Sequence, residues 1–269
     1  MIGIIGGSGL YKLAGLTIHE TKKIKTPFGE PSDSYTIGRL GNEEIVFLPR
    51  HSHLHNIPPH RVNYRANILG MQKLGVDKII AVSAVGGINL TFATGDIVIP
   101  DQIIDFTKNR EHTFFDGDPV THVDFTEPFC PDLRTEIIET AEMVNVGIHS
   151  HGTYLCVEGP RYETAAEIRF FGSIGADLVG MTAMPEAILA RESGICYALV
   201  SVVTNQAAGI SKEELNTKEV VVTMQKSMDK IKGLLLGITG QMEGPSKCTC
   251  RKALEKAGIT SSAATQNED

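Results

Sequence analysis

Two residues from distant segments, Glu163 and Asn205, have side chains that can together read the edge of a flat heterocycle. A carboxylate accepts a hydrogen bond from a ring N–H, whereas a side-chain amide both donates and accepts. Tyr162 precedes Glu163 and offers the face of an aromatic ring. If these side chains share one pocket, that pocket suits a purine with a 6-oxo group.

A second group of reactive side chains lies at residues 50–55, where one arginine and three histidines follow an apolar run. Because a guanidinium binds phosphate through two parallel hydrogen bonds, we favour an anion site here. The alternatives are a three-histidine metal site and a solvated polar loop. No acidic co-ligand lies nearby in the sequence, which weighs against the metal.

Two glycine-rich turns and one threonine are further candidates for anion binding. Residues 6–9 (Gly-Gly-Ser-Gly) could cradle an oxyanion with backbone N–H groups, although a plain tight turn explains them equally well. They do not match a dinucleotide fingerprint, because Lys12 stands where a third glycine is needed, and no P-loop lysine follows. Residues 83–87 and Thr182 likewise end apolar runs, with a simple strand-to-turn exit as the alternative.

Alternating apolar runs and amphipathic stretches predict an α/β fold. The predicted strands and helices are as follows. Strands are expected over Ile2–Ile5, Ile45–Leu48, Lys78–Ala84, Asp96–Pro100, Leu178–Met181 and Ile195–Val203, and helices over Asn63–Leu74, Pro131–Val144, Ala165–Phe171, Pro185–Glu192 and Thr217–Leu236. Ligands collect at the carboxyl ends of strands in such sheets. The candidate side chains follow strands, so we expect them to converge.

Composition excludes several classes of function. The chain has 269 residues, 42% hydrophobic residues and a net charge of −7, without a Lys/Arg run, so nucleic-acid binding is not expected. No apolar stretch is long enough for a membrane span, and the N-terminus lacks the basic region of a signal peptide. We expect a cytoplasmic protein with one domain over residues 1–240 and a tail over 241–269. The segment 109–128 is expected to be a long functional or interface loop.

The five cysteines are odd in number and scattered, so a disulfide framework is not expected. Cys156 and Cys196 lie in apolar runs and are interpreted as core residues. Cys248 and Cys250 are interpreted as exposed thiols of the tail. No second Cys/His pair follows them at zinc spacing, so no metal is expected.

The sequence resembles the family of trimeric purine nucleoside phosphorylases and methylthioadenosine phosphorylases over nearly all of residues 1–237. The segments that carry the resemblance include residues 4–10, Arg50-His51, 62–68, 95–99, 127–131, 158–164, 180–182 with Pro185-Glu186, and Thr204-Asn205. The resemblance implies one α/β domain with a mixed sheet around a distorted barrel, flanked by helices. It also implies a homotrimer, or a dimer of trimers, that cleaves nucleosides with inorganic phosphate as co-substrate and uses no cofactor.

The resemblance also implies roles for individual residues. Phosphate would be held by Ser8, Arg50, His51, His55, Ser83, Ala84 and Thr182. Met181 would pack on the ribose, Tyr162 would stack near the base, and His122 would reach into the site of a neighbouring subunit. Glu163 and Asn205 would bind the base and stabilise it as it leaves.

Branches of this family differ at the base pocket. Members that use 6-aminopurines resemble one another in having aspartates where this chain has Asn205 and Ala207, and a small hydroxyl residue where it has Glu163. The pattern here is that of the 6-oxopurine enzymes, because a carboxylate accepts the N1–H of hypoxanthine and repels the bare N1 of adenine. At the 5′ end Thr217 stands where inosine enzymes place a histidine, so S-methyl-5′-thioinosine is a candidate beside inosine and guanosine.

Other functions remain open at this point. Methylthioadenosine phosphorylase is the main alternative, and Glu163 and Asn205 disfavour it. Two further hypotheses remain: a non-catalytic sensor of nucleoside or phosphate, and a hydrolase that uses water. The absence of an acid–base dyad or nucleophilic serine motif is compatible with a reaction driven by positioning and charge stabilisation.

Overall fold

The computed structural model describes residues 1–7, 15–117, 120–211, 215–240 and 248–259. Its strands and helices have the following bounds. The strands are β1 (Ile2–Gly6), β2 (Thr17–Lys22), β3 (Tyr35–Leu40), β4 (Glu43–Pro49), β5 (Lys78–Gly87), β6 (Ile97–Val98), β7 (Gln102–Phe106), β8 (Ile148–His149), β9 (Thr153–Val157), β10 (Leu178–Gly180) and β11 (Cys196–Gln206). The helices are η1 (Pro59–Arg61), α1 (Tyr64–Lys73), α2 (Pro131–Met143), α3 (Ala165–Ser173), α4 (Ala183–Glu192), α5 (Thr217–Thr239), η2 (Cys250–Lys252) and α6 (Ala253–Lys256).

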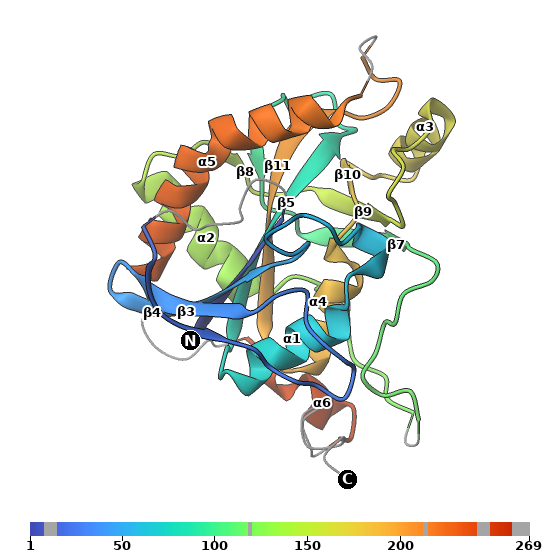
Figure 1. The fold of residues 1–269 in the computed structure, drawn as a ribbon. Coiled ribbons are helices and arrows are strands. Elements are labelled where there is room, and N and C mark those ends of the chain that lie inside the picture. Colours follow the sequence, from blue (N-terminus) through green and yellow to red (C-terminus); the bar gives the residue numbers. More distant parts are fainter. Residues whose placement is uncertain (8–14, 118–119, 212–214, 241–247, 260–269) are drawn as a thin grey trace.

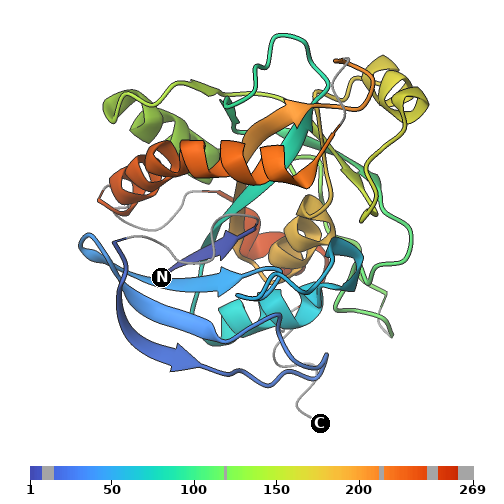
Figure 2. The same ribbon diagram turned by 45° about the horizontal axis from the view of Figure 1, so that its top comes forward.

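The strands form one mixed sheet that branches at β5. The main path runs β2-β3-β4-β1-β5-β10-β9-β7, and β11 pairs with the other edge of β5 and continues to β6 and β8. Strands β1, β4, β5 and β11 are parallel, so their carboxyl ends meet at one edge. Figure 2 shows β2, β3 and β4 side by side at one end of the sheet. The expected α/β fold with a mixed sheet and flanking helices is confirmed. The distorted barrel stays a prediction.

Successive residues of the central strands face two separate hydrophobic cores. Ile5, Ile79 and Leu199 belong to a core that includes side chains of α1 and α4. Ile4, Ile80 and Val200 belong to a second core built with α2 and α5. This period of two is what a strand buried on both faces requires. Figure 1 shows α2 and α5 on one side of the sheet and α1 and α4 on the other.

Five strands were not predicted, namely β2, β3, β7, β8 and β9. All but one of the residues of β2 are exposed, so that strand has no apolar run to mark it. Among the described helices none is long and apolar enough to cross a membrane.

The interpretation of Cys248 and Cys250 as exposed tail thiols is wrong for Cys250, whose side chain is buried in the core beside α2 and α5. The segment from Cys248 to Ile259 forms η2 and α6, and α6 packs on α4. Arg251 of this segment pairs with Asp77 before β5. The described part of the C-terminal segment therefore packs against the body of the domain.

Candidate active site

A cavity of about 400 Å³ lies where β1, β4, β5 and β11 end or approach their ends. Its walls contain most of the residues that the sequence singles out. They are Arg50, His51, His55, Ser83, Ala84, Tyr162, Glu163, Met181, Thr182, Asn205 and Thr217, together with Gly7 and Thr204 from segments also noted in the sequence. Asn56 and Val220 are among the lining residues that the sequence did not indicate. The expected convergence of these side chains at the carboxyl edge of the sheet is found.

Glu163 lies between β9 and α3, in a segment that the helix fixes from one side. Thr164 caps α3, and its side chain and that of Glu167 form reciprocal hydrogen bonds with backbone N–H groups. Burial raises the pKa of the Glu163 carboxyl above its ordinary value. A carboxylate without a full hydration shell is ready to accept an N–H of a bound base.

Asn205 owes its position to a bulge near the end of β11. The register between β11 and β5 shifts between Val203 and Asn205, so Thr204 is the extra residue. The Thr204 hydroxyl lies 2.9 Å from Oδ1 of Asn205 and donates to it, and Nδ2 of Asn205 donates to the Gln206 carbonyl over 2.9 Å. These two contacts orient the amide and leave one N–H of Nδ2 for a ligand.

The same cavity wall carries groups suited to an anion. Ser83 in β5 is 3% exposed, and its buried hydroxyl has no hydrogen-bond partner among the described residues. Thr182 is also buried in the cavity wall, and its backbone N–H donates to the Tyr154 hydroxyl. A buried hydroxyl without a partner costs free energy, which a bound ligand would offset.

The guanidinium of Arg50 hydrogen-bonds to other protein groups as well as facing the cavity. Its guanidinium is 1% exposed and donates to both carboxylate oxygens of Glu186, over 2.7 and 2.8 Å. Nη1 also donates to the carbonyl of Val82, and the Tyr197 hydroxyl donates to Glu186. Two of the five N–H groups of Arg50 therefore remain for an anion. Glu186 was not assigned a role from the sequence, because a glutamate after a proline reads as an exposed start of a helix.

Gly7 explains how this guanidinium reaches the cavity. A Cβ at Gly7 would lie 3.0 Å from Nη1 of Arg50 and 3.3 Å from the Val82 carbonyl. The glycine turn after β1 thus makes room for the arginine, whatever else it binds. Ser8 lies outside the described residues, and its predicted contact with phosphate remains a prediction.

His51 and His55 lie side by side in the cavity wall, with ring centroids 5.2 Å apart. Burial and the positive charge of Arg50 lower the pKa of His51 to about 4, and burial lowers the pKa of His55. Nδ1 of His51 lies 2.8 Å from the carbonyl of Ile57. A carbonyl only accepts, so the neutral ring carries its proton on Nδ1 and a lone pair on Nε2.

Met181 lines the cavity, and both its side chain and its backbone carbonyl have close contacts that fix its position. Its sulfur lies against Gly159, where a Cβ would come within 2.6 Å. The buried Arg110, from the long loop after β7, donates to the carbonyls of Met181 and Met184 and to that of Glu158. Sequence reasoning missed Arg110, since nothing in a loop of mixed composition marks one arginine as buried.

Two predicted residues do not line this cavity. Ala207 is 2% exposed and packs in the core with Leu155 and Phe171, behind Asn205. His122 is exposed on the loop between β7 and α2. Thr217, at the start of α5, does line the cavity, one turn before Val220.

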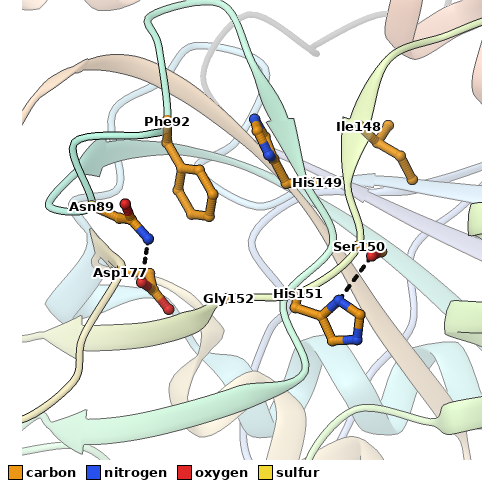
Figure 3. Close-up of a pocket in the computed structure, with 8 residues that line it drawn as sticks. All are labelled: Asn89, Phe92, Ile148, His149, Ser150, His151, Gly152 and Asp177. Carbon is orange, nitrogen blue, oxygen red and sulfur yellow. Dashed lines mark hydrogen bonds between the residues drawn. The ribbon is translucent and has the colours of Figure 1, made fainter.

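A second cavity, of about 450 Å³, lies near β8 (Figure 3). Its polar side chains have hydrogen-bond partners, either in the cavity wall or, for His149, outside it. Asn89 donates to Asp177, Ser150 contacts His151, and His149 contacts Asp96 outside the view. This cavity offers no unpaired hydroxyl comparable with Ser83, and we assign the function to the first cavity.

Comparisons with known proteins identify the family of the chain. A model of the phosphorylase superfamily matches residues 1–239. The chain is 51% identical, over 96% of its length and 97% of the relative, to the probable S-methyl-5′-thioinosine phosphorylase of Thermodesulfovibrio yellowstonii. It is 49% identical to the 6-oxopurine nucleoside phosphorylase of Pyrococcus furiosus, over 95% of this chain and 98% of that one.

The fold comparison leads to the same family. The crystal structure of a methylthioadenosine phosphorylase from an antarctic soil metagenomic library has a TM-score of 0.88 at 39% identity, covering 95% of this chain and 91% of that one. Methylthioadenosine phosphorylase from Schistosoma mansoni in complex with adenine has a TM-score of 0.90 at 31% identity, covering 98% and 97%. The chain therefore belongs to the phosphorylase superfamily and is an enzyme of its purine nucleoside phosphorylase group.

Proposed function

We propose that this enzyme cleaves 6-oxopurine nucleosides with inorganic phosphate, giving the free base and a ribose 1-phosphate. The observation that carries the proposal is a single cavity whose wall contains Glu163, Asn205 and the buried Ser83 hydroxyl, which has no partner among the described residues. Inosine, guanosine and S-methyl-5′-thioinosine are the candidate substrates. Purine salvage from a cytoplasmic pool is the process that this reaction serves.

The base is read by two complementary hydrogen bonds. Glu163, as a carboxylate, accepts the N1–H of hypoxanthine or guanine, and the remaining N–H of Asn205 donates to the N7 and O6 edge. The C1′–N9 bond breaks, and its electron pair leaves with the base. Asn205 therefore donates to the atoms where negative charge develops, and such a contact contributes about 10²–10³ in kcat. Tyr162 lies beside the base and Met181 beside the ribose.

Phosphate attacks C1′ as the glycosidic bond breaks, and a C1′–O bond forms. Ser83, Thr182, the backbone at Ala84 and the free N–H groups of Arg50 supply donors for its oxygens. Neutral His51 has an accepting Nε2, so it suits the P–OH of hydrogen phosphate, with His55 next to it. The negative charge of phosphate also stabilises the cationic ribose in the transition state.

The 5′ end of the substrate lies against the start of α5. Thr217 and Val220 line the cavity there, and neither carries a charge. A hydroxyl of Thr217 suits a 5′-hydroxyl, whereas the methyl groups of Val220 suit a 5′-methylthio group. The lining by Thr217 and Val220 is consistent with the names of both relatives above. One is a probable S-methyl-5′-thioinosine phosphorylase and the other a 6-oxopurine nucleoside phosphorylase.

We also propose a homotrimer, alone or as a dimer of trimers, in which the exposed His122 reaches a neighbour's site. His122 is exposed on the loop between β7 and α2, whereas Phe114, Phe115 and Phe125 of the same loop pack against the core. Analytical ultracentrifugation tests the assembly, and a monomer with full activity would remove His122 from the site.

Methylthioadenosine phosphorylase is the alternative, supported by the names of several relatives, including one from Saccharolobus solfataricus that is 46% identical. The test is base release from inosine, guanosine, S-methyl-5′-thioinosine and methylthioadenosine, each with and without phosphate. We expect phosphate-dependent release from the three 6-oxopurine substrates and little from methylthioadenosine. A preference for methylthioadenosine would overturn the base assignment, and binding without turnover would indicate a sensor.

A further inference from the structure

Four of the five cysteines come together in the structure, although they belong to three separate parts of the sequence. The sulfur atoms of Cys130, Cys196, Cys248 and Cys250 all lie within 4.8 Å of one another. Three of these side chains are buried, and that of Cys248 is half-buried. The Cys196 and Cys248 sulfurs are 3.3 Å apart.

This spacing matches a tetrahedral metal site. Four sulfurs bound to zinc at about 2.3 Å form a tetrahedron with edges of about 3.8 Å. One separation here is 3.3 Å and none exceeds 4.8 Å, so that edge lies between these two values. All four sulfurs converge on one point, whereas disulfides would require only that they approach in two pairs.

We propose that Cys130, Cys196, Cys248 and Cys250 form a structural tetrathiolate site for a soft divalent cation, zinc above all. Thiolate is the ligand that zinc prefers in closed structural sites, and binding releases the thiol protons. Sequence spacing did not indicate this site, because the second pair of ligands comes from two separate elements. Cys130 precedes α2 and Cys196 begins β11.

The site would fasten the C-terminal segment to the catalytic domain. Cys248 and Cys250 belong to this segment, and Cys130 is tied to β11 by its backbone N–H, which donates to the Tyr197 carbonyl over 2.8 Å. The Tyr197 side chain in turn donates to Glu186, the partner of Arg50. Metal bound here therefore stabilises the fold close to the support of the anion site, without touching substrate.

The test is the metal content of the full chain, purified under reducing conditions and measured by inductively coupled plasma mass spectrometry. We expect one zinc per chain, falling below about a tenth in Cys130→Ser and Cys250→Ser. Cys156→Ser is the matched control, because Cys156 is a buried thiol outside the cluster, and it should keep its zinc. Cobalt substitution should give the intense near-ultraviolet charge-transfer absorption of a tetrathiolate.

Two results would overturn the proposal. One is a zinc content below about a tenth per chain in the wild type after refolding with zinc. The other is a mass spectrum of the non-reduced protein in which the four cysteines form disulfides and no metal is bound. If the serine variants instead fail to fold, release of zinc from the wild type on titration of its thiols with a mercurial supports the site, and no release contradicts it.

Discussion

Replacing Glu163 with glutamine should change the substrate preference of the enzyme while leaving it at least as stable. Hydrogen bonds to charged groups contribute about 1.5–3 kcal/mol, roughly twice the value for neutral pairs. Losing that difference, about 0.75–1.5 kcal/mol, should lower kcat/KM for inosine about 3- to 10-fold. The new amide can donate to the bare N1 of adenine, which the carboxylate repels. The preference for inosine over adenosine should therefore fall by at least about 10-fold.

The stability change follows from the raised pKa of Glu163. Between its ordinary pKa and its raised pKa in the folded state, the folded protein binds more protons than the unfolded one. The free energy of unfolding therefore falls as pH rises through this window. The full loss of stability caused by the buried, ionised carboxylate is present at neutral pH. Glutamine has no such cost, so Tm at pH 7 should rise or stay unchanged. In the wild type, activity should be lost on acidification at a higher pH than an ordinary glutamate would give.

The assay is chromatography of the base released from inosine and adenosine, with kcat/KM measured for each substrate from pH 5 to 8. Glu142→Gln is the control, because Glu142 is exposed on α2 and far from the cavity. If Glu163→Gln left the ratio of kcat/KM for inosine to that for adenosine unchanged, this would refute the claim that Glu163 selects the base. A lower Tm would refute the account of its burial.

Three further variants test the rest of the site. Asn205→Asp should lower kcat for inosine about 10²–10³-fold, because a donor to the developing charge is lost; a kcat within a factor of three of wild type would exclude this role. Ser83→Ala should raise the KM for phosphate several-fold without lowering Tm, since the hydroxyl has no partner to lose; initial rates and calorimetry check this, and a lower Tm with unchanged KM would contradict it. Arg50→Ala should lower the free energy of unfolding by about 3–5 kcal/mol in urea denaturation, because it leaves the Glu186 carboxylate buried and unpaired. A loss under about 1 kcal/mol would show that the pair is not structurally important.

The sequence was sufficient for the architecture and for most of the cavity wall. Apolar runs mark β1, β5 and β11 because these strands are buried on both faces, and polar residues such as Ser83 and Asn205 stand out at their ends. Strand β2 could not be recognised in this way, because its residues are almost all exposed.

Contacts that depend on tertiary structure could not be predicted. The pairing of Arg50 with Glu186 joins residues 136 positions apart, and nothing local distinguishes a buried glutamate from an exposed one. The same holds for Arg110 and for the cysteine cluster, whose members come from three separate parts of the chain. Ala207 was placed in the base site by resemblance, whereas the bulge in β11 leaves it in the core behind Asn205.

The most direct test of the account is phosphorus NMR of the wild-type enzyme with inosine and inorganic phosphate, followed by the same measurement with methylthioadenosine. The account predicts that inosine gives a ribose 1-phosphate resonance in equal amount to the released hypoxanthine, and that methylthioadenosine gives little. Free ribose with unchanged phosphate would contradict phosphorolysis. A sugar phosphate from methylthioadenosine alone would contradict the reading of the base by Glu163 and Asn205.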